Sequence, residues 1–520
     1  MQVKRIYNGA DALCSTLLAN GIDVCFTNPG TSEMHFVAAL DREEDMRCVL
    51  GTFEGVVTGA ADGYARMAGK PAATLLHLGP GLANGLANLH NARRAGTPIV
   101  NVVGDHATYH LPYDAPLTSD IESLARPMSA AVRRVRDAGD VSLATAEAIE
   151  ASRQNGGQIA TLILPADAAW DPAPETIHRA ATPTPTVNME AVQLVAKALR
   201  NGKRSLIVAG GKALMDDELK LCSSISHATG ARLLAEGAIT RMERGQGRVK
   251  TDRIPYAVDL ALEKLAEVEQ LILVDSTAPV AFFAYPEKPS RLTAPDCEIL
   301  SLARPGDDIA GALAALSDAL GAKAAAPTLA TLVDRPELPK EGFDASTIMR
   351  AVATLLPEGA IVCDEAITAG RLNFALMAGS AQHDYLQLTG GAIGIGIPMA
   401  TGAAVASPDR KVVALQADGS GMYTMQGLWT QARENLDVLT IIFANRKYAI
   451  LYNELRMMGV ETPGHNARRM LDLDSPAFDW VSMGKAAGVE SARADNLATF
   501  IDLFRAGLSK RGPFLIEAWL

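Results

Sequence analysis

The sequence predicts an α/β fold made of three doubly wound domains, each built on a parallel sheet. Short apolar runs typical of buried strands alternate with stretches of helical periodicity along the chain, which favours parallel sheets covered by helices on both faces. With 520 residues, the chain is also too long for a single core. Two linkers rich in Pro, Thr or Ala, 171–186 and 322–340, divide it into three parts. We therefore expect domains over 1–175, 187–322 and 341–520.

Each expected strand is a short, mostly apolar run that ends near a turn former or a polar residue. In the first part these runs are 24–26, 73–76, 99–103 and 160–164. The middle part offers 205–209 and 271–275, and the last part offers 360–363, 411–417 and 438–444. Because helical stretches separate consecutive runs, the crossovers that parallel pairing requires are present.

The composition indicates a soluble protein and excludes several classes of partner. Hydrophobic residues make up 48% of the chain, aromatic residues only 5%, and the net charge is −11 without a basic stripe, so we expect no nucleic-acid partner. No run of eighteen apolar residues and no signal-like start is present, so we expect no membrane span. The six cysteines form no CxxC pair, which is typical of reduced residues. We expect a cytoplasmic protein.

Two polar residues follow neighbouring strand candidates in the last part of the chain. Asp418 comes directly after 411–417, and Asn445 comes directly after 438–444. In an open parallel sheet, ligands lie outside the carboxyl ends of the strands. Carboxylate and amide oxygens suit Mg²⁺, and the bare backbone of Gly419 lets N–H groups approach a phosphate. The pair therefore indicates a cation site next to a phosphate group.

A glycine-rich helical stretch stands out in the first part. Gly55, Gly59 and Gly63 lie four residues apart on one helix face, where each costs about 1 kcal/mol relative to Ala. We expect the close approach of another backbone to compensate, with a subunit boundary as one place for that contact. Glu54 begins the same helix, where the dipole favours a carboxylate. From the residues alone, Glu54 is either a first-turn acid or a catalytic group.

Taken together, these segments resemble the thiamine diphosphate-dependent decarboxylase and synthase family. The resemblance rests on three motifs in the family's order: Glu54 within 54–66, the Gly-rich segment 390–398, and the Asp418 to Asn445 element. It implies a pyrimidine domain, a middle domain and a diphosphate domain. Ala417 departs from the family's usual Gly. Arg446 and Lys447 also depart from it, because a cation so near the diphosphate is unusual.

The resemblance implies a role for each matched residue. Glu54 would bind the pyrimidine nitrogen and activate the cofactor, and Ile393 would wedge between the cofactor rings. The Gly391 carbonyl would accept from the exocyclic amine. The remaining cofactor contacts would come from Thr368, Gly419 and Ser420 to the diphosphate, and from Asp418, Asn445 and the Lys447 carbonyl to Mg²⁺.

On the substrate side, the nearest local similarity is to benzoylformate decarboxylase. It covers 27–33, 75–79 and 117–128, and it implies that Thr31 and His77 face the carboxylate and carbonyl of a 2-oxo acid. A lone His after a strand is equally a structural residue. Such decarboxylases often have a second histidine in the middle domain, whereas 278–285 has none and offers an apolar wall.

Acetolactate synthase is the competing resemblance. The segment Gly79 to Asn84 is more similar to the synthase loop, while Gly104-Asp105-His106 departs from the usual Gly-Gln. We expect His106 and His110 to be polar loop residues. Synthases of this kind bind FAD in the middle domain, but Gly210-Gly211 is a short turn without the GxGxxG fingerprint. FAD is therefore left possible but unsupported.

These observations predict an enzyme that uses thiamine diphosphate and Mg²⁺ to decarboxylate a small 2-oxo acid. After CO₂ release, the enamine would be protonated to an aldehyde or would attack a second carbonyl compound, as in acetolactate synthase. A catalytically silent, cofactor-binding regulatory homologue is the other alternative, and the intact Glu54, Asp418 and Asn445 argue against it. The resemblance also implies a homodimer or homotetramer with active sites between chains.

Overall fold

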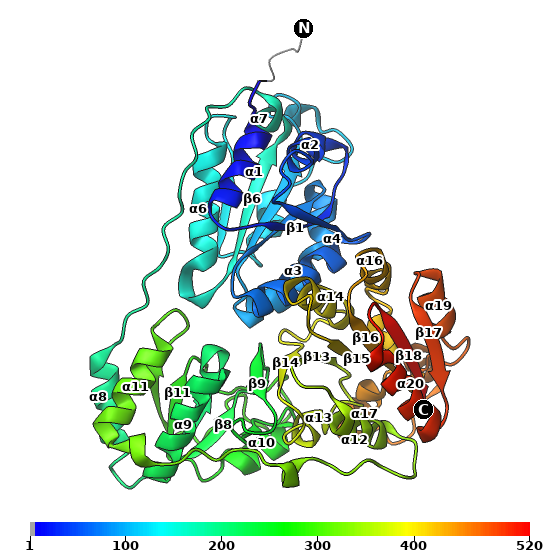
Figure 1. Ribbon diagram of the computed structural model, residues 1–520. Helices are drawn as coiled ribbons and strands as arrows, with labels where there is room; N and C mark the ends of the chain where they lie inside the picture. The colour runs from blue at the N-terminus through cyan, green and yellow to red at the C-terminus, as the bar shows by residue number, and fades with distance from the viewer. Residues whose placement is uncertain (1–5) are drawn as a thin grey trace. The chain divides into compact units, whose positions relative to one another are not determined.

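The computed structural model describes residues 6–520, which form two compact units. The first unit contains residues up to 183 together with 363–368 and 390–520, and the second contains 184–362 and 369–389. Strand β13 (Ala360–Glu365) begins in the second unit and ends in the first. The linker between α7 and α8 contains neither helix nor strand, as predicted (Figure 1).

The first unit opens with a six-stranded sheet of order β2-β1-β3-β4-β6-β5, in which every printed pairing is parallel. Its strands are β1 (Val24–Asn28), β2 (Arg47–Leu50), β3 (Ala72–Leu76), β4 (Ile99–Asp105), β5 (Ala131–Arg134) and β6 (Ile159–Pro165). The helices of this part are α1 (Gly9–Ala19), α2 (Met34–Leu40), α3 (Glu54–Ala68), α4 (Leu78–Ala95), α5 (Ile121–Ala125), α6 (Val141–Arg153) and α7 (Ala166–Trp170).

Helices cover this sheet in two pairs, α1 with α6 and α3 with α4 (Figure 1). The α1–α6 side forms a continuous apolar core with the strands, to which Leu13, Leu17, Val102, Ile149 and Leu162 contribute fully buried side chains. Burying aliphatic side chains of this size contributes about 1.5–3 kcal/mol each. The α1–α6 side of the sheet therefore rests on a well-packed apolar core.

The first unit also contains a second parallel sheet, in which the strands neighbour one another in the order β17-β18-β16-β15. These strands are β15 (Val412–Ala417), β16 (Val438–Ala444), β17 (Glu490–Ala494) and β18 (Phe514–Trp519). The accompanying helices are α14 (Gly396–Ala406), α15 (Asp418–Gly421), α16 (Gly427–Arg433), α17 (Ala449–Met457), α18 (His465–Leu471), α19 (Trp480–Ala486) and α20 (Leu497–Ser509).

The second unit contains a five-stranded parallel sheet of order β10-β8-β7-β11-β12. Its strands are β7 (Ser205–Ala209), β8 (Arg232–Ala235), β10 (Asp252–Arg253), β11 (Gln270–Val274) and β12 (Glu298–Ala303). Its helices are α8 (Met189–Ala198), α9 (Asp216–Thr229), α10 (Val258–Leu265), α11 (Ile309–Leu320), α12 (Ala345–Leu355) and α13 (Asn373–Leu376).

One pairing departs from the predicted parallel pattern. Strand β9 (Met242–Arg244) runs antiparallel to β14 (His383–Gln387). Two of the three residues of β9 are charged, so no apolar run marks this strand in the sequence. The α/β fold with parallel sheets is otherwise confirmed. None of the helices within residues 6–520 is both long and apolar enough to cross a membrane.

The glycine-rich helix α3 packs against α14 of the same chain. A Cβ on Gly63 would overlap the carbonyl oxygen of Met399, and a Cβ on Gly402 would overlap that of Ala60. The predicted close approach of another backbone is therefore confirmed, and the partner helix belongs to the same chain. This crossing fixes the start of α3, where Glu54 lies, relative to the loop that precedes α14.

Candidate active site

Asp418 and Asn445 lie at the same edge of their sheet. Asp418 begins α15 directly after β15, and Asn445 directly follows β16. The two strands are parallel neighbours, with Ala417 opposite Phe443. The backbone N–H of Arg446 donates to Oδ2 of Asp418 at 2.6 Å, which places the loop after β16 against this carboxylate.

The environment of Asp418 fits an oxygen-coordinated cation. Its side chain is only 2% exposed, and burial raises its pKa to about 6 although the N–H groups of Arg446 and Gly419 oppose the shift. No Lys, Arg or His among residues 6–520 forms a recorded ion pair with it. A buried carboxylate without a cationic partner is costly, and a divalent ion would offset that cost. Carboxylate, amide and backbone carbonyl oxygens together suit Mg²⁺.

The side chain of Arg446 turns away from this carboxylate. Its guanidinium donates to the Leu520 carbonyl at 2.6 Å and lies 4.3 Å from the centre of the Trp519 ring. The residue adopts a left-handed backbone with φ of 54°, which brings its N–H to Asp418 while its side chain reaches β18. Although Arg446 departs from the family pattern, its guanidinium therefore does not lie beside Asp418, next to which the diphosphate is expected. Lys447 is exposed.

Ala417 causes no conformational strain where the family usually has Gly. Its φ is −84° and its ψ is 148°, an extended conformation that any residue adopts. Gly419 makes a closer approach, because a Cβ there would lie 2.6 Å from the Tyr448 ring. Ser420 accepts from the Gln416 side chain at 2.5 Å, and Thr368 is partly buried after β13.

A buried carboxyl that the motifs did not indicate holds the loop containing Ile393. Glu365 is 1% exposed and accepts from the backbone N–H groups of Gly394 at 2.5 Å and Gly396 at 2.6 Å. Burial raises its pKa to about 7, although these hydrogen bonds lower it. Gly391 and Gly394 have φ of 79° and 99°, so both positions favour glycine. Glu365 therefore fixes a loop of unusual backbone conformation.

Glu54 is buried at the start of α3, as the sequence predicts. Its Oε2 accepts from the Asn84 side chain at 2.9 Å, and the absence of a Cβ at Gly81 lets α4 approach its Oε1. The segment from Gly79 to Asn84 is thus the beginning of α4 and positions Glu54. Two residues of this segment, Gly81 and Asn84, lie directly against Glu54.

One amide joins the Glu54 region to the Ile393 loop within the chain. Asn88 of α4 donates to the carbonyl of Gly55 at 2.7 Å and to the carbonyl of Gly394 at 3.4 Å. These carbonyls belong to the residues that follow Glu54 and Ile393. The structure therefore brings two of the predicted cofactor-contacting segments together, although they are far apart in the sequence.

His77 pairs with a buried carboxylate, that of Glu33, which the sequence analysis did not identify. Its Nδ1 lies 2.8 Å from Oε2 of Glu33, which also accepts from the N–H of Gly30 at 2.8 Å. The other oxygen of Glu33 is buried without a hydrogen-bond partner among the described residues, and a Cβ on Gly104 would overlap it. The ring of His77 is therefore held at one nitrogen and remains partly exposed.

Residues near His77 differ in backbone conformation and exposure. Leu78 directly after it has φ of 49°, a strained conformation for a branched residue and typical of functional sites. Thr31 is exposed at the start of the short 3-10 helix Thr31–Glu33. The rings of His106 and His110 lie 5.5 Å apart, and His110 is exposed. These contacts are compatible with the expected polar loop roles of both histidines.

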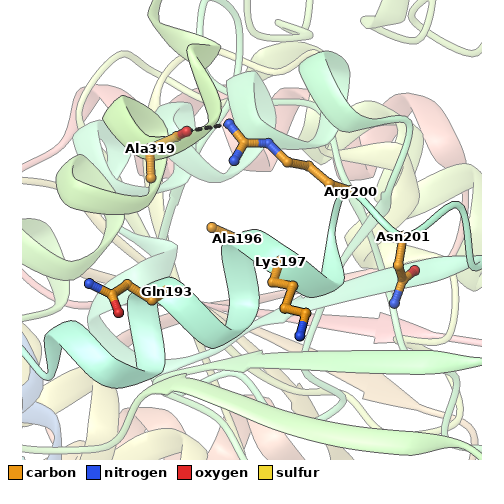
Figure 2. Close-up of a pocket in the computed structure, with 6 residues that line it drawn as sticks. All are labelled: Gln193, Ala196, Lys197, Arg200, Asn201 and Ala319. Atoms are coloured by element: carbon orange, nitrogen blue, oxygen red, sulfur yellow. Dashed lines mark hydrogen bonds between the residues drawn. The ribbon is translucent and has the colours of Figure 1, made fainter.

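The second unit offers two further surfaces. Phe282 lies 4.8 Å from Phe283 and 5.2 Å from Tyr256, measured between ring centres, and all three side chains are exposed. A hollow of about 510 Å³ is lined by residues that include Gln193, Arg200 and Ala319. Figure 2 shows the Arg200 side chain donating to the Ala319 carbonyl there. None of the predicted site residues lines this hollow, so it does not belong to the candidate active site.

Comparisons with known proteins identify the family of the chain. Residues 7–124 match the family described as thiamine pyrophosphate enzyme, N-terminal TPP binding domain, and residues 370–518 match its C-terminal TPP binding domain. A Mycobacterium tuberculosis protein provisionally named acetolactate synthase large subunit IlvX is 50% identical over 98% of both chains. Benzoylformate decarboxylase of Pseudomonas aeruginosa is 27% identical over 96% of both.

Solved structures show the same fold. The chain is similar to the thiamine diphosphate-dependent 4-hydroxybenzoylformate decarboxylase of Rhodococcus jostii, with a TM-score of 0.86 and 22% identity, covering 98% of this chain and 99% of that one. The N-terminal match contains Glu54, and the C-terminal match contains Ile393 and Asp418. The chain therefore belongs to the thiamine pyrophosphate enzyme family, among its decarboxylases and acetolactate synthases.

Proposed function

We propose that this protein is a Mg²⁺-dependent 2-oxo acid decarboxylase that uses thiamine diphosphate and resembles benzoylformate decarboxylase. The main support is the buried carboxylate of Asp418, which lies at the same sheet edge as Asn445 in surroundings that fit an oxygen-coordinated cation. The His77–Glu33 pair supports a site that handles protons at the substrate carbonyl. A silent regulatory homologue would have no need for this set of buried acids.

Thiamine diphosphate, when bound, would supply a nucleophilic carbon and an electron sink for the decarboxylation. Glu54 would hold a proton at the pyrimidine nitrogen, and the hydrogen bond from Asn84 fixes its carboxylate for that task. Ile393 would hold the two rings in a bent arrangement. The Gly391 carbonyl would accept from the exocyclic amine.

The metal would be held by Asp418, Asn445 and the Lys447 carbonyl, with Thr368, Gly419 and Ser420 at the diphosphate. Asp418 already accepts from Gly419 and Arg446, so its carboxylate orientation is set by the backbone. At the substrate, Thr31 would bind the carboxylate. His77 would move a proton at the carbonyl oxygen, and Glu33 would orient its ring.

Carboligation, as in acetolactate synthase, is the second candidate. It is favoured by the 50% identity to the Mycobacterium tuberculosis protein with that provisional name. The two reactions share the decarboxylation step and differ in whether a proton or a second 2-oxo acid is the acceptor. Residues of the decarboxylation site therefore serve both.

We further propose a cytoplasmic homodimer or homotetramer whose active sites form between chains. Free cysteines throughout the described chain support a reducing compartment. Exposed apolar side chains near the diphosphate end, including Tyr423, Leu451 and Met458, support coverage by another chain.

A panel of 2-oxo acids tests the proposal. Benzoylformate and pyruvate are each incubated with protein, thiamine diphosphate and Mg²⁺, and CO₂ is scored separately from the carbon product. We expect CO₂ and an aldehyde from an aromatic acid, whereas acetolactate from pyruvate would favour the second candidate. Absence of CO₂ from every acid would defeat both. The variant Glu54→Gln should lose turnover, and unchanged activity would contradict its assigned role.

A further inference from the structure

The second unit has the crevice at which doubly wound sheets bind nucleotides. Its chain runs from β7 outward to β8 and β10, and then returns to the other side of β7 to form β11 and β12. The strand order therefore reverses between β7 and β11, and such folds take their ligands at the carboxyl ends of the strands at this point. Gly210 and Gly211 follow β7, and N–H groups at this position normally face a diphosphate.

In this protein, two carboxylates of the chain itself accept from N–H groups of the loop after β7. Glu236, which follows β8, accepts from the N–H of Gly211 at 3.2 Å. Asp275, which follows β11, accepts from the N–H of Lys212 at 2.7 Å. A Cβ on Gly210 would lie 2.6 Å from Oε2 of Glu236, so this carboxyl lies directly against the loop. A diphosphate would have to displace both side chains.

An acid at the end of the second strand also occurs in dinucleotide-binding proteins, where it binds ribose hydroxyls. Glu236 instead points back to the loop N–H, which leaves it no role of that kind in this conformation. Electrostatics acts in the same direction. Burial raises the pKa of Glu236 to about 8 and also raises that of Asp275, so the surroundings of both carboxyls disfavour negative charge, and a diphosphate there would meet the same cost.

We infer that this protein binds neither FAD nor another dinucleotide in its second unit, because Glu236 and Asp275 fill the diphosphate subsite. Glu236 and Asp275 would thus distinguish this protein from synthases that contain a flavin. It is independent of the proposed reaction, since neither acid belongs to the candidate active site.

The test is a binding titration with FAD and, separately, with ADP. Purified protein holding thiamine diphosphate and Mg²⁺ is titrated, and flavin fluorescence and co-elution in gel filtration report binding. We expect no saturable binding to the unmodified protein. The double variant E236A/D275A should bind with one site per chain and at least tenfold more tightly, a difference of about 1.4 kcal/mol.

A matched control removes two carboxylates elsewhere in the same unit. Glu263 and Asp296 are exposed and lie before the amino ends of β11 and β12, away from the crevice. The variant E263A/D296A changes the net charge equally and should still bind no FAD. Should the double variant fail to fold, E236A and D275A alone should each gain at least about threefold in affinity.

Stoichiometric FAD binding by the unmodified protein would overturn the inference. So would folded crevice variants that bind no better than the control, because the two carboxylates would then not be the obstacle. Activity with 2-oxo acids is a separate measurement. Its failure would count against the proposed reaction and leave the titration result unaffected.

Discussion

Replacing Glu365 with Gln should change how the stability of the protein depends on pH. The carboxyl of Glu365 is 1% exposed, and burial raises its pKa from 4.5 to about 7. Between these two values the native protein binds a proton that the unfolded chain does not. The stability due to this group is therefore greatest below pH 4.5 and falls as pH rises through 7.

The size of the effect follows from the shift. One pKa unit corresponds to 1.36 kcal/mol, so the native protein should lose about 3 kcal/mol of stability from this group between pH 4.5 and 8. A Gln side chain does not titrate and avoids that loss. It also has only one acceptor oxygen for the two N–H groups of Gly394 and Gly396, which should cost about 1–3 kcal/mol at every pH.

The variant should thus be less stable than the unmodified protein at pH 5. At pH 8 its free energy of unfolding should approach or exceed that of the unmodified protein. Urea unfolding at pH 5, 6, 7 and 8 measures this, with fluorescence of the fully buried Trp480 reporting the same unit. The matched control is E461Q, because Glu461 is exposed. Its stability should stay parallel to that of the unmodified protein. Parallel curves for E365Q as well would refute the reasoning.

Three further predictions concern the active site and the helix that carries it. If sites form between chains, mixed dimers of coexpressed E54Q and D418N chains should have up to about half of the activity of the unmodified dimer. One of their two sites then receives both intact residues. Mixed dimers without activity would place each site within one chain. E33Q should lower kcat and alter the pH profile of kcat while cofactor affinity stays unchanged, since Glu33 contacts His77 and not the cofactor segments. An unaltered pH profile would contradict the proposed role of Glu33 in orienting His77. Gly63→Ala should lower the free energy of unfolding in urea by about 1–3 kcal/mol or more, because its Cβ would overlap α14. The control Gly464→Ala, at a position with open space around it, should have little effect. Equal effects would show that the α3–α14 contact does not cause the destabilisation.

Elements that depend on local pattern could be predicted from the sequence. The expected strand 411–417 is β15 (Val412–Ala417), and 438–444 is β16. Because these strands are consecutive in sequence and parallel neighbours, Asp418 and Asn445 had to end at one edge of the sheet. The glycine spacing of α3 also indicated a close backbone partner. These features follow from periodicity and from the geometry of parallel sheets.

Residues whose roles depend on distant packing could not be found in this way. Glu33 meets His77 across 44 positions, and Glu365 meets Gly394 across 29. Neither acid belongs to a pattern that marks it as buried, and acids are usually exposed. The direction of the Arg446 side chain was equally hidden, because it depends on a left-handed backbone and on the neighbouring strand β18.

Arg446 also has a practical consequence for handling the protein. Its guanidinium donates to the carbonyl of Leu520, and its backbone N–H donates to Asp418. Arg446 therefore links the residue that follows β18 to the carboxylate expected to bind the metal. An affinity tag attached directly after Leu520 would pull on that connection. Cofactor affinities should therefore be measured on protein tagged at the other end, and a loss of Mg²⁺ response confined to the C-terminally tagged form would trace to this link.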